Sequence, residues 1–286
     1  MKTSFLSLGI FLALSIGAPA QQDFSKVEIK ATQVAKNIYM LEGAGGNIGV
    51  SVGPDGLLIV DDQFAPLAQK IEAALKQLNP GKLKFVLNTH HHGDHTGGNA
   101  HFGREAHIIA HTNVRKRLRK GPSESQPGLP IITFDDALSL HFNGEEIKML
   151  HVPPGHTDGD SIIHFTGANV VHMGDSFASG RFPNIDLAGG GDVRGFIRNV
   201  ETAIAKIPAD AKIIPGHGPL STLKEMKEFH AMLVETSGIV ENAIAAGKTL
   251  DQIKAEGLPE KWKNWAGPMI NPGRWLEILY RGLSRK

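Results

Sequence analysis

The chain has 286 residues, a formal net charge of +1 and no cysteine. Its length suits one large domain, and its near-neutral charge is unlike the broad basic surface of a nucleic-acid-binding protein, so no nucleic-acid partner is expected. The lack of cysteine excludes disulfide bonds and thiolate metal ligands, so a metal site in this chain must use nitrogen and oxygen atoms.

The first 20 residues have the pattern of a cleaved secretory signal. Lys2 supplies a positive charge, residues 5–16 form an apolar run, and Ala18-Pro19-Ala20 is a small-residue cleavage site. A membrane-anchoring helix is the alternative, but it needs a longer apolar run. We therefore expect a mature domain of residues 21–286, without a membrane anchor, that is secreted or periplasmic.

Strand-like and helix-like segments alternate in the first half of the mature chain. The sequence predicts a hairpin over residues 47–60, a helix over 66–78, a strand over 84–88, a strand over 106–110 and then a basic helix. The basic run of residues 115–120 suits a solvated helix face better than a contact with an anionic partner.

The second half continues the alternation. The predicted elements are a hairpin around Asn143-Gly144, a strand pair over 161–165 and 170–173, a helix over 191–207 and a strand over 212–214. Three helices are predicted to follow: a long one over 221–246, a short one that begins after Thr249, and a last one over 272–282. We expect Ser221 to cap the longest helix and Thr249 to cap the short one that follows.

Seven metal-capable side chains follow predicted strands. Four of them form one compact run and three stand alone in glycine-bearing turns: His90, His92, Asp94, His95, His156, Asp175 and His217. We expect the run to form a loop after a buried strand, with all seven converging on one rim of a sheet. Five imidazoles and two carboxylates suffice for two adjacent metal ions with open positions for water.

These motifs together resemble those of the metallo-β-lactamase superfamily of hydrolases. The resemblance rests on four stretches and covers essentially the whole mature chain: Thr89-His-His-His-Gly-Asp-His95, Pro154-Gly155-His156-Thr157, Gly174-Asp175-Ser176 and Pro215-Gly216-His217-Gly218. It implies an α/β fold, an αβ/βα four-layer sandwich of two mixed β-sheets with helices on the outer faces.

The resemblance also implies a division of the ligands between two ions. His90, His92 and His156 would hold the first ion, Asp94, His95 and His217 the second, and Asp175 would bridge both. Imidazoles and carboxylates suit zinc, and suit iron or manganese less decisively, so two Zn²⁺ ions are the expected cofactors.

Further residues are expected around these ions. Asp94 would orient the water nucleophile and relay its proton, and Asp61 would bind the outer nitrogen of a ligand histidine, unless it only caps the helix that follows. Ser176, Ser179 and Arg181 are expected to contact substrate, although a surface role for Arg181 is the alternative. Residues 43–47 are a candidate flap.

The expected activity is hydrolysis of a carbonyl bond in a small-molecule substrate by a hydroxide that bridges the two ions. The all-histidine branch of the metallo-β-lactamases is the most similar named group, so a β-lactam amide is the leading substrate. A lactone, thioester or ester is the alternative, and an iron-dependent redox protein or a non-catalytic metal-binding protein is a more distant one. The sequence leaves the oligomeric state open.

Overall fold

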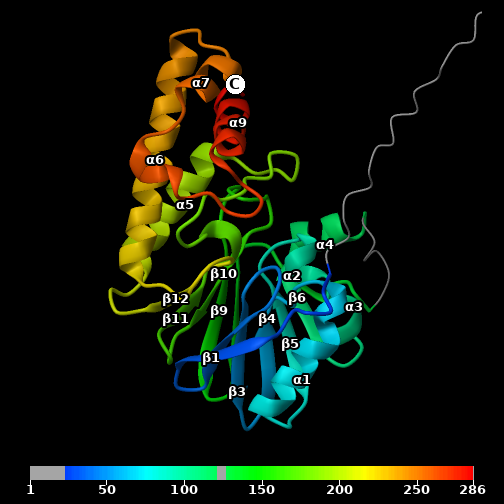
Figure 1. Ribbon diagram of the computed structural model, residues 1–286. Coiled ribbons are helices and arrows are strands. Elements are labelled where there is room, and N and C mark those ends of the chain that lie inside the picture. Colours follow the sequence, from blue (N-terminus) through cyan, green and yellow to red (C-terminus); the bar gives the residue numbers. More distant parts are fainter. Residues whose placement is uncertain (1–22, 121–126, 286) are drawn as a thin grey trace, which may run out of the picture.

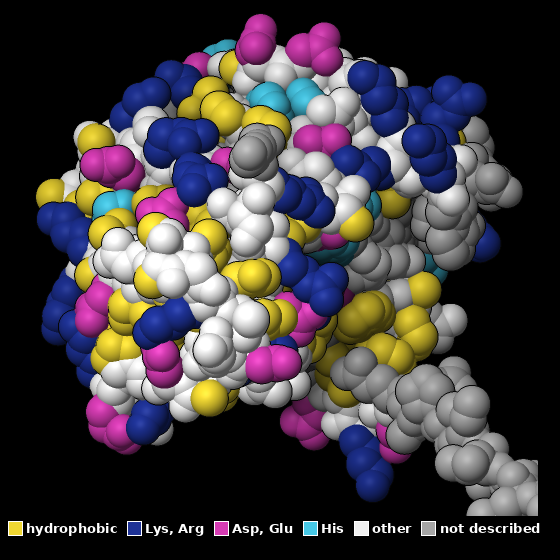
Figure 2. Space-filling model, turned by 90° about the horizontal axis from the view of Figure 1, so that it is seen from above, with side chains coloured by type: hydrophobic (Ala, Val, Ile, Leu, Met, Phe, Trp, Pro, Cys, Tyr) yellow, Lys and Arg dark blue, Asp and Glu magenta, His cyan; other side chains and the backbone are white. Residues whose placement is uncertain are grey.

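The computed structural model describes residues 23–120 and 127–285. The predicted signal, residues 1–20, lies outside this part of the chain. Within the described ranges, no helix is both long enough and apolar enough to cross a bilayer. Figure 2 shows Lys and Arg side chains spread over one face and interspersed with Asp, Glu and apolar side chains.

The first half of the chain builds a mixed seven-stranded sheet with its strands in sequence order. The strands are β1 (Lys30–Ala35), β2 (Ile38–Glu42), β3 (Ile48–Gly53), β4 (Gly56–Val60), β5 (Leu83–Asn88), β6 (His107–His111) and β7 (Ile132–Phe134). Strands β1 to β4 pair antiparallel, and β4 to β7 pair parallel. The parallel strands are those that lead towards the histidine run.

The second half builds a mixed five-stranded sheet in the order β12-β11-β10-β9-β8. Its strands are β8 (Ala137–Phe142), β9 (Glu145–His151), β10 (Ser161–Phe165), β11 (Val170–His172) and β12 (Lys212–Ile214). Only β11 and β12 pair in parallel, because α5 (Val193–Lys206) lies between them in the sequence and provides the crossover.

Three apolar layers hold the sheets and helices together. One lies between the two sheets and includes Leu58, Leu87 and Ile163. A second packs the seven-stranded sheet against α1 (Ala68–Leu78), and a third packs the other sheet against α5 and the C-terminal helices. Figure 1 shows the helices on the outer sides of the two sheets. The predicted four-layer αβ/βα sandwich is therefore confirmed.

The C-terminal helices gather at one end of the molecule (Figure 1). They are α6 (Leu223–Ala245), α7 (Leu250–Glu256), α8 (Glu260–Lys263) and α9 (Pro272–Leu283). Trp275 of α9 is fully buried, stacks on Phe182 with ring centroids 5.8 Å apart, and donates a hydrogen bond to Thr236 of α6 over 3.1 Å. These contacts fix the end of the chain beside the second sheet.

The prediction that Ser221 caps the long helix is wrong. Thr222 is the N-cap, and Glu225 completes a capping box by accepting from the backbone N–H of Thr222 over 2.9 Å. The Ser221 hydroxyl is buried and donates instead to Ser179 over 2.8 Å. Thr249 caps α7 as expected.

The histidine run is also not entirely a loop. Its second part forms the one-turn helix α2 (Gly93–Thr96), which is followed by α3 (Asn99–Phe102). Strands β1, β2 and β7 and helix α8 had no counterpart among the sequence predictions. The basic segment forms α4 (Thr112–Leu118).

Candidate metal centre

The seven predicted ligands come from both sheets and meet on one rim. His90 and His92 lie on the loop after β5, and Asp94 and His95 lie on α2. The other three follow strands of the second sheet: His156 comes after β9, Asp175 after β11 and His217 after β12. These seven residues make up two metal-capable groups, one of His90, His92, His156 and Asp175, the other of Asp94, His95 and His217. A third such group among the described residues, His91, His92 and Asp186, shares His92 with the first.

In the first group three imidazole nitrogens converge. His92 Nδ1 lies 3.2 Å from His90 Nε2 and 2.9 Å from His156 Nε2. Zinc–nitrogen bonds of about 2.0–2.1 Å in tetrahedral geometry separate two ligand nitrogens by roughly 3.3 Å. The spacing of these nitrogens therefore fits a zinc ion between them.

The outer nitrogens of the same three rings face oxygen atoms. His90 Nδ1 contacts Thr89 Oγ1 at 3.0 Å, and His156 Nδ1 contacts the carbonyl of Asn184 at 2.8 Å. His92 Nε2 contacts Asp186 at 3.0 Å. An imidazole that donates its outer N–H has a lone pair on its inner nitrogen. The inner nitrogens can therefore bind a metal ion as neutral ligands.

The second group has the same character. His95 Nε2 and His217 Nε2 approach to 3.4 Å, and Asp94 Oδ2 lies 3.4 Å from His217 Nε2 and 3.8 Å from His95 Nε2. The outer Nδ1 of His95 donates to Asp61 over 2.7 Å. Two imidazoles and one carboxylate leave room for further ligands on a hard or borderline cation.

Asp175 faces both groups with different oxygens. Its Oδ1 lies 3.1 Å from His95 Nε2 and 3.3 Å from His217 Nε2. Its Oδ2 lies 3.5 Å from His156 Nε2 and 3.9 Å from His90 Nε2. One carboxylate oxygen therefore faces each group, an arrangement that suits a ligand shared by two ions.

Asp61 is fully buried and anchors the start of the histidine run. Its Oδ1 accepts from the backbone N–H of Thr89 over 2.8 Å, and its Oδ2 accepts from the Thr89 hydroxyl and from His95, each over 2.7 Å. Because the Thr89 hydroxyl donates to Asp61, its oxygen is free to accept from His90. Asp61 therefore orients one ligand of each group, whereas Asp62 accepts from the backbone N–H of Gly98.

The two groups differ in their proton affinity. Burial lowers the pKa of His90, His92 and His156, so these imidazoles are neutral near pH 7. Burial also opposes charge on His217, but Asp175 and Asp94 outweigh it and raise the pKa of His217 to about 9. The pKa of His95 is raised for the same reason, with Asp175 and Asp94 outweighing burial.

Asp186 is a functional candidate that the sequence did not reveal. Besides contacting His92, it accepts from the backbone N–H of Gly189 over 2.7 Å, and its own N–H donates to the carbonyl of His156 over 2.9 Å. It stands 94 positions from His92, so no local spacing pointed to it. His91 also lies near Asp186, with its Nε2 4.0 Å from Oδ2 of that carboxylate, and it is partly buried.

A cavity of about 410 Å³ lies beside the ligands. His92, Asp94, Asp175 and His217 line it, together with Arg181. Ser176 and Ser179, the other predicted substrate contacts, are buried and lie outside the lining, and the Ser179 hydroxyl accepts from Ser221. The structure thus brings Arg181 to the cavity and leaves both serines in the packing beneath it.

The candidate flap, residues 43–47, is tied down by hydrogen bonds. Gly46 donates its N–H to the carbonyl of Asp94 over 3.0 Å, and the Asn47 side chain donates to the carbonyls of Pro215 and Gly218. A Cβ on Gly46 would lie 2.1 Å from Cε1 of His95, so this position must be glycine for the chain to pass so close to a ligand. Gly46 and Asn47 are thus anchored next to the ligands.

Comparison with known families now identifies the class of protein. The family model described as the metallo-beta-lactamase superfamily matches residues 32–217. The chain belongs to the metallo-beta-lactamase superfamily.

Curated relatives within the superfamily differ in activity. The alpha subunit of a 2,4-dinitroanisole O-demethylase from Nocardioides sp. is 27% identical over 46% of this chain and 42% of its own length. A hydroxyacylglutathione hydrolase from Pelagibacter ubique is 31% identical over 47% of this chain and 52% of its own length. These matches span about half of each relative. A metallo-beta-lactamase type 2 from Bacteroides fragilis is 21% identical over 76% of this chain and 90% of its own.

A solved structure supports the fold. The DIM-1 metallo-beta-lactamase superposes with a TM-score of 0.64 at 18% identity, over 73% of this chain and 99% of its own. The family model ends at His217, so the C-terminal helices α6 to α9 follow the matched region.

Proposed function

We propose that this protein is an exported hydrolase that uses two zinc ions to open a carbonyl bond in a small-molecule substrate. The observation that supports it best is the pair of converging ligand groups that share Asp175. Membership of the superfamily and the hydrolases among its relatives support the reaction class. When bound, the zinc ions would supply Lewis acidity and lower the pKa of a water molecule towards about 7.

The residues of the chain have distinct roles in this proposal. His90, His92 and His156 would hold the first ion, Asp94, His95 and His217 would hold the second, and Asp175 would be shared by both groups. Asp94 lies in the lining of the cavity, where its carboxylate orients the attacking water and accepts its proton. Arg181 also lines the cavity and is placed to bind an anionic group of the substrate.

A β-lactam amide is the first candidate substrate. The relative that aligns over the largest share of this chain among those compared above is a metallo-beta-lactamase. A thioester is the second candidate, because a relative of higher identity is a hydroxyacylglutathione hydrolase. Lactones and simple esters present the same polarised carbonyl and complete the substrate panel.

The test combines metal analysis with substrate turnover. Purified protein is expected to bind two zinc ions per chain and to hydrolyse at least one of a chromogenic cephalosporin, an acylglutathione thioester, an acyl lactone and an aryl ester. Turnover of another panel member but not of the cephalosporin would reject the lactamase assignment and retain the hydrolase. Iron in place of zinc, or zinc without turnover of any panel member, would reject the proposal in favour of a redox or metal-binding protein.

Replacement of Asp94 provides a direct test of the mechanism. Asp94→Ala removes both a ligand and the proton acceptor, so kcat should fall by about 100-fold or more. Zinc at the first ion should persist, because none of its proposed ligands has changed. Wild-type kcat in a folded Asp94→Ala protein would contradict the assigned role.

Export has a separate test. Expression of the full chain in a bacterial host should place the protein in the periplasm or medium, with Gln21 as its first residue. Retention of residues 1–20 in the cytoplasm would reject this part of the proposal without affecting the hydrolase.

A further inference from the structure

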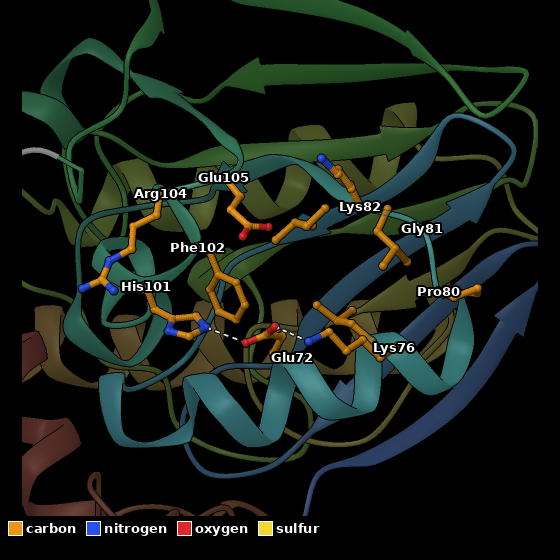
Figure 3. A pocket seen from close by; sticks show the side chains of 12 residues that line it. Glu72, Lys76, Pro80, Gly81, Lys82, His101, Phe102, Arg104 and Glu105 are labelled. Atoms are coloured by element: carbon orange, nitrogen blue, oxygen red, sulfur yellow. Dashed lines mark hydrogen bonds and ion pairs between the residues drawn. The ribbon is translucent and has the colours of Figure 1, made fainter.

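The described residues include two cavities of similar size, of about 350 and 410 Å³. The remote one, of about 350 Å³, lies by α1 and α3 (Figure 3). Its Glu72 is already engaged by Lys76 at 2.5 Å and His101 at 2.9 Å. The cavity beside the ligands has apolar lining residues, of which Met269 is exposed, and this apolar lining suggests a substrate preference.

The apolar lining includes Phe64, Met269 and Ile270, which we call the apolar wall; Met269 is exposed and Ile270 is largely buried. Met269 is 76% exposed, the largest exposed fraction among the large apolar side chains of the described residues. Exposed apolar surface inside a cleft that also contains converging polar groups is typical of a ligand-binding site. A bound apolar group would remove this surface from water.

The wall is built into the fold. Ile270 is buried in the core of the second half, and its carbonyl accepts from the N–H of Gly267 over 3.0 Å. The N–H of Phe182 donates to the carbonyl of Trp265 over 2.9 Å, which joins the same segment to the loop that includes Arg181. Phe64, which comes from the first half of the chain, packs against Phe24 with ring centroids 5.3 Å apart.

The position of the apolar wall in the chain also bears on its role. Met269 and Ile270 follow the region matched by the family model, which ends at His217. The ligand groups lie within that region, whereas this part of the wall comes from the additional C-terminal segment. The segment can therefore set which substrate reaches the ligands without altering the ligands themselves.

We infer that the cavity selects substrates with an apolar acyl group, and that Met269 is a specificity-determining residue for that group. This inference rests on the proposed hydrolase function. The acyl group lies against Phe64, Met269 and Ile270 while its carbonyl faces the ligand cluster. The size of the cavity suits a small molecule, since pockets of roughly 300–1,000 Å³ enclose ligands of that class.

The experiment compares two esters with the same leaving group. For zinc-loaded protein, kcat/KM for p-nitrophenyl octanoate should exceed that for p-nitrophenyl acetate. Met269→Ser should reduce this ratio by roughly 3- to 10-fold, since one methylene in an apolar pocket changes discrimination by about 10- to 200-fold and this wall is partly open. Met269→Leu should retain the ratio.

The matched control is Val234→Ser on α6. Val234 is also exposed and apolar, at 49%, but it does not line the cavity. Its replacement should leave the ratio unchanged. An unchanged ratio in Met269→Ser, or an equal loss in Val234→Ser, would overturn the inference.

A binding measurement separates failure of the inference from failure of the proposed function. Calorimetric titration of the same proteins with octanoate and acetate does not require turnover. If no ester is hydrolysed but wild-type protein binds octanoate more tightly than acetate, and Met269→Ser loses the difference, the hydrolase proposal fails on esters and the apolar subsite stands. Equal binding of both acids by the wild type would overturn the subsite.

Discussion

At the residue scale, Asp61 is a buried side chain that contacts both Thr89 and His95. Its backbone has a φ of 64°, a left-handed conformation that aspartate and asparagine tolerate better than most residues. Through this bend the carboxylate reaches Thr89 and His95 at once. A single buried group thereby contacts residues that adjoin or belong to both ligand groups.

Asp61→Ala should therefore weaken metal binding and stability together. The change leaves buried donors of Thr89 and His95 unpaired, at a cost of about 1–3 kcal/mol for each unsatisfied group. Loss of such an outer partner typically lowers metal affinity by about 10- to 100-fold. Competitive chelator titration measures the affinity, and urea unfolding of the metal-free protein measures the stability.

Asp61→Asn is the matched control, because asparagine keeps the left-handed backbone and one carbonyl acceptor. It should unfold at urea concentrations closer to those of the wild type than Asp61→Ala does. Equal zinc affinity in Asp61→Ala and wild type would show that the ligands are oriented by other contacts.

Proton release should distinguish the two ions. The pKa of His217 is raised to about 9, so near pH 7 metal binding at the second site must displace a proton. His90, His92 and His156 have lowered pKa values and compete with no proton at that pH. Affinity at the second site should accordingly rise as the pH increases towards 9, while affinity at the first site stays nearly constant.

Zinc titration in buffers with different ionisation enthalpies measures the protons released by each ion. Release of protons with the second ion but not with the first is expected. Identical release for both ions between pH 7 and 9 would contradict the assigned difference in protonation.

The sequence revealed the candidate ligands because they form local motifs, and it also proposed Asp61 as a partner for one of them, but it missed Asp186. The histidine run places four candidates within six positions, and glycine-bearing turns mark the others. Asp186 has no such motif, and its contact with His92 depends on how the two sheets pack. The burial of Ser176 and Ser179 was hidden from the sequence for the same reason.

At the scale of single elements, the N-cap of α6 shows how much structural information the local sequence contains. Ser221 and Thr222 are adjacent hydroxyl residues, and either can cap a helix. The presence of Glu225 three positions after Thr222 completes a capping box and distinguishes the two. This information was in the sequence, whereas the hydrogen bond that engages Ser221 with Ser179 was not.

Thr222→Ala should destabilise the protein by about 0.5–2 kcal/mol, because α6 loses its capping side chain. Thr222→Ser keeps the hydroxyl and should retain most of the stability. Chemical denaturation of both zinc-loaded variants measures the difference. Equal unfolding midpoints for wild type and Thr222→Ala would show that packing of α6 alone determines its start.

The strands predicted from the sequence agree with those of the structure where apolar residues are dense, as in β4 and β5. Strand β1 was not predicted, because it is an edge strand with only partly buried or exposed residues and a weak alternation. Pairing with β2, which is a tertiary effect at the sheet edge, decides its conformation.

At the scale of the whole molecule, the ligands connect the two sheets. Four come from the loop and helix that follow β5, and three come from loops of the second sheet. The sandwich architecture could be anticipated from the family resemblance, but alternation of strands and helices alone does not fix the packing of two sheets. The position of the centre at their common rim follows from that packing.

Zinc should therefore stabilise the fold as a whole. A ligand present at 100 to 1,000 times its Kd adds about 2.7–4.1 kcal/mol to the free energy of unfolding. For a domain of this size each kcal/mol raises Tm by about 2–4 °C, so a rise of roughly 5–16 °C is expected over chelated protein. Differential scanning calorimetry with zinc and with a chelator tests this.

The combined variant His95→Ala/His217→Ala should show a smaller rise, because the second ion has lost two ligands. A Tm that is the same with zinc and with chelator would mean that the ions contribute nothing to holding the sheets together.

Because each sheet supplies only part of the ligand set, neither half of the polypeptide contains a complete centre. A duplicated or transplanted half would inherit the fold of one layer pair and none of the chemistry. Changes that loosen the contact between the sheets, even far from any ligand, would spread the donor atoms apart and abolish activity before the chain unfolds. The packing between the sheets therefore sets the spacing of the donor atoms, together with the loops that carry them.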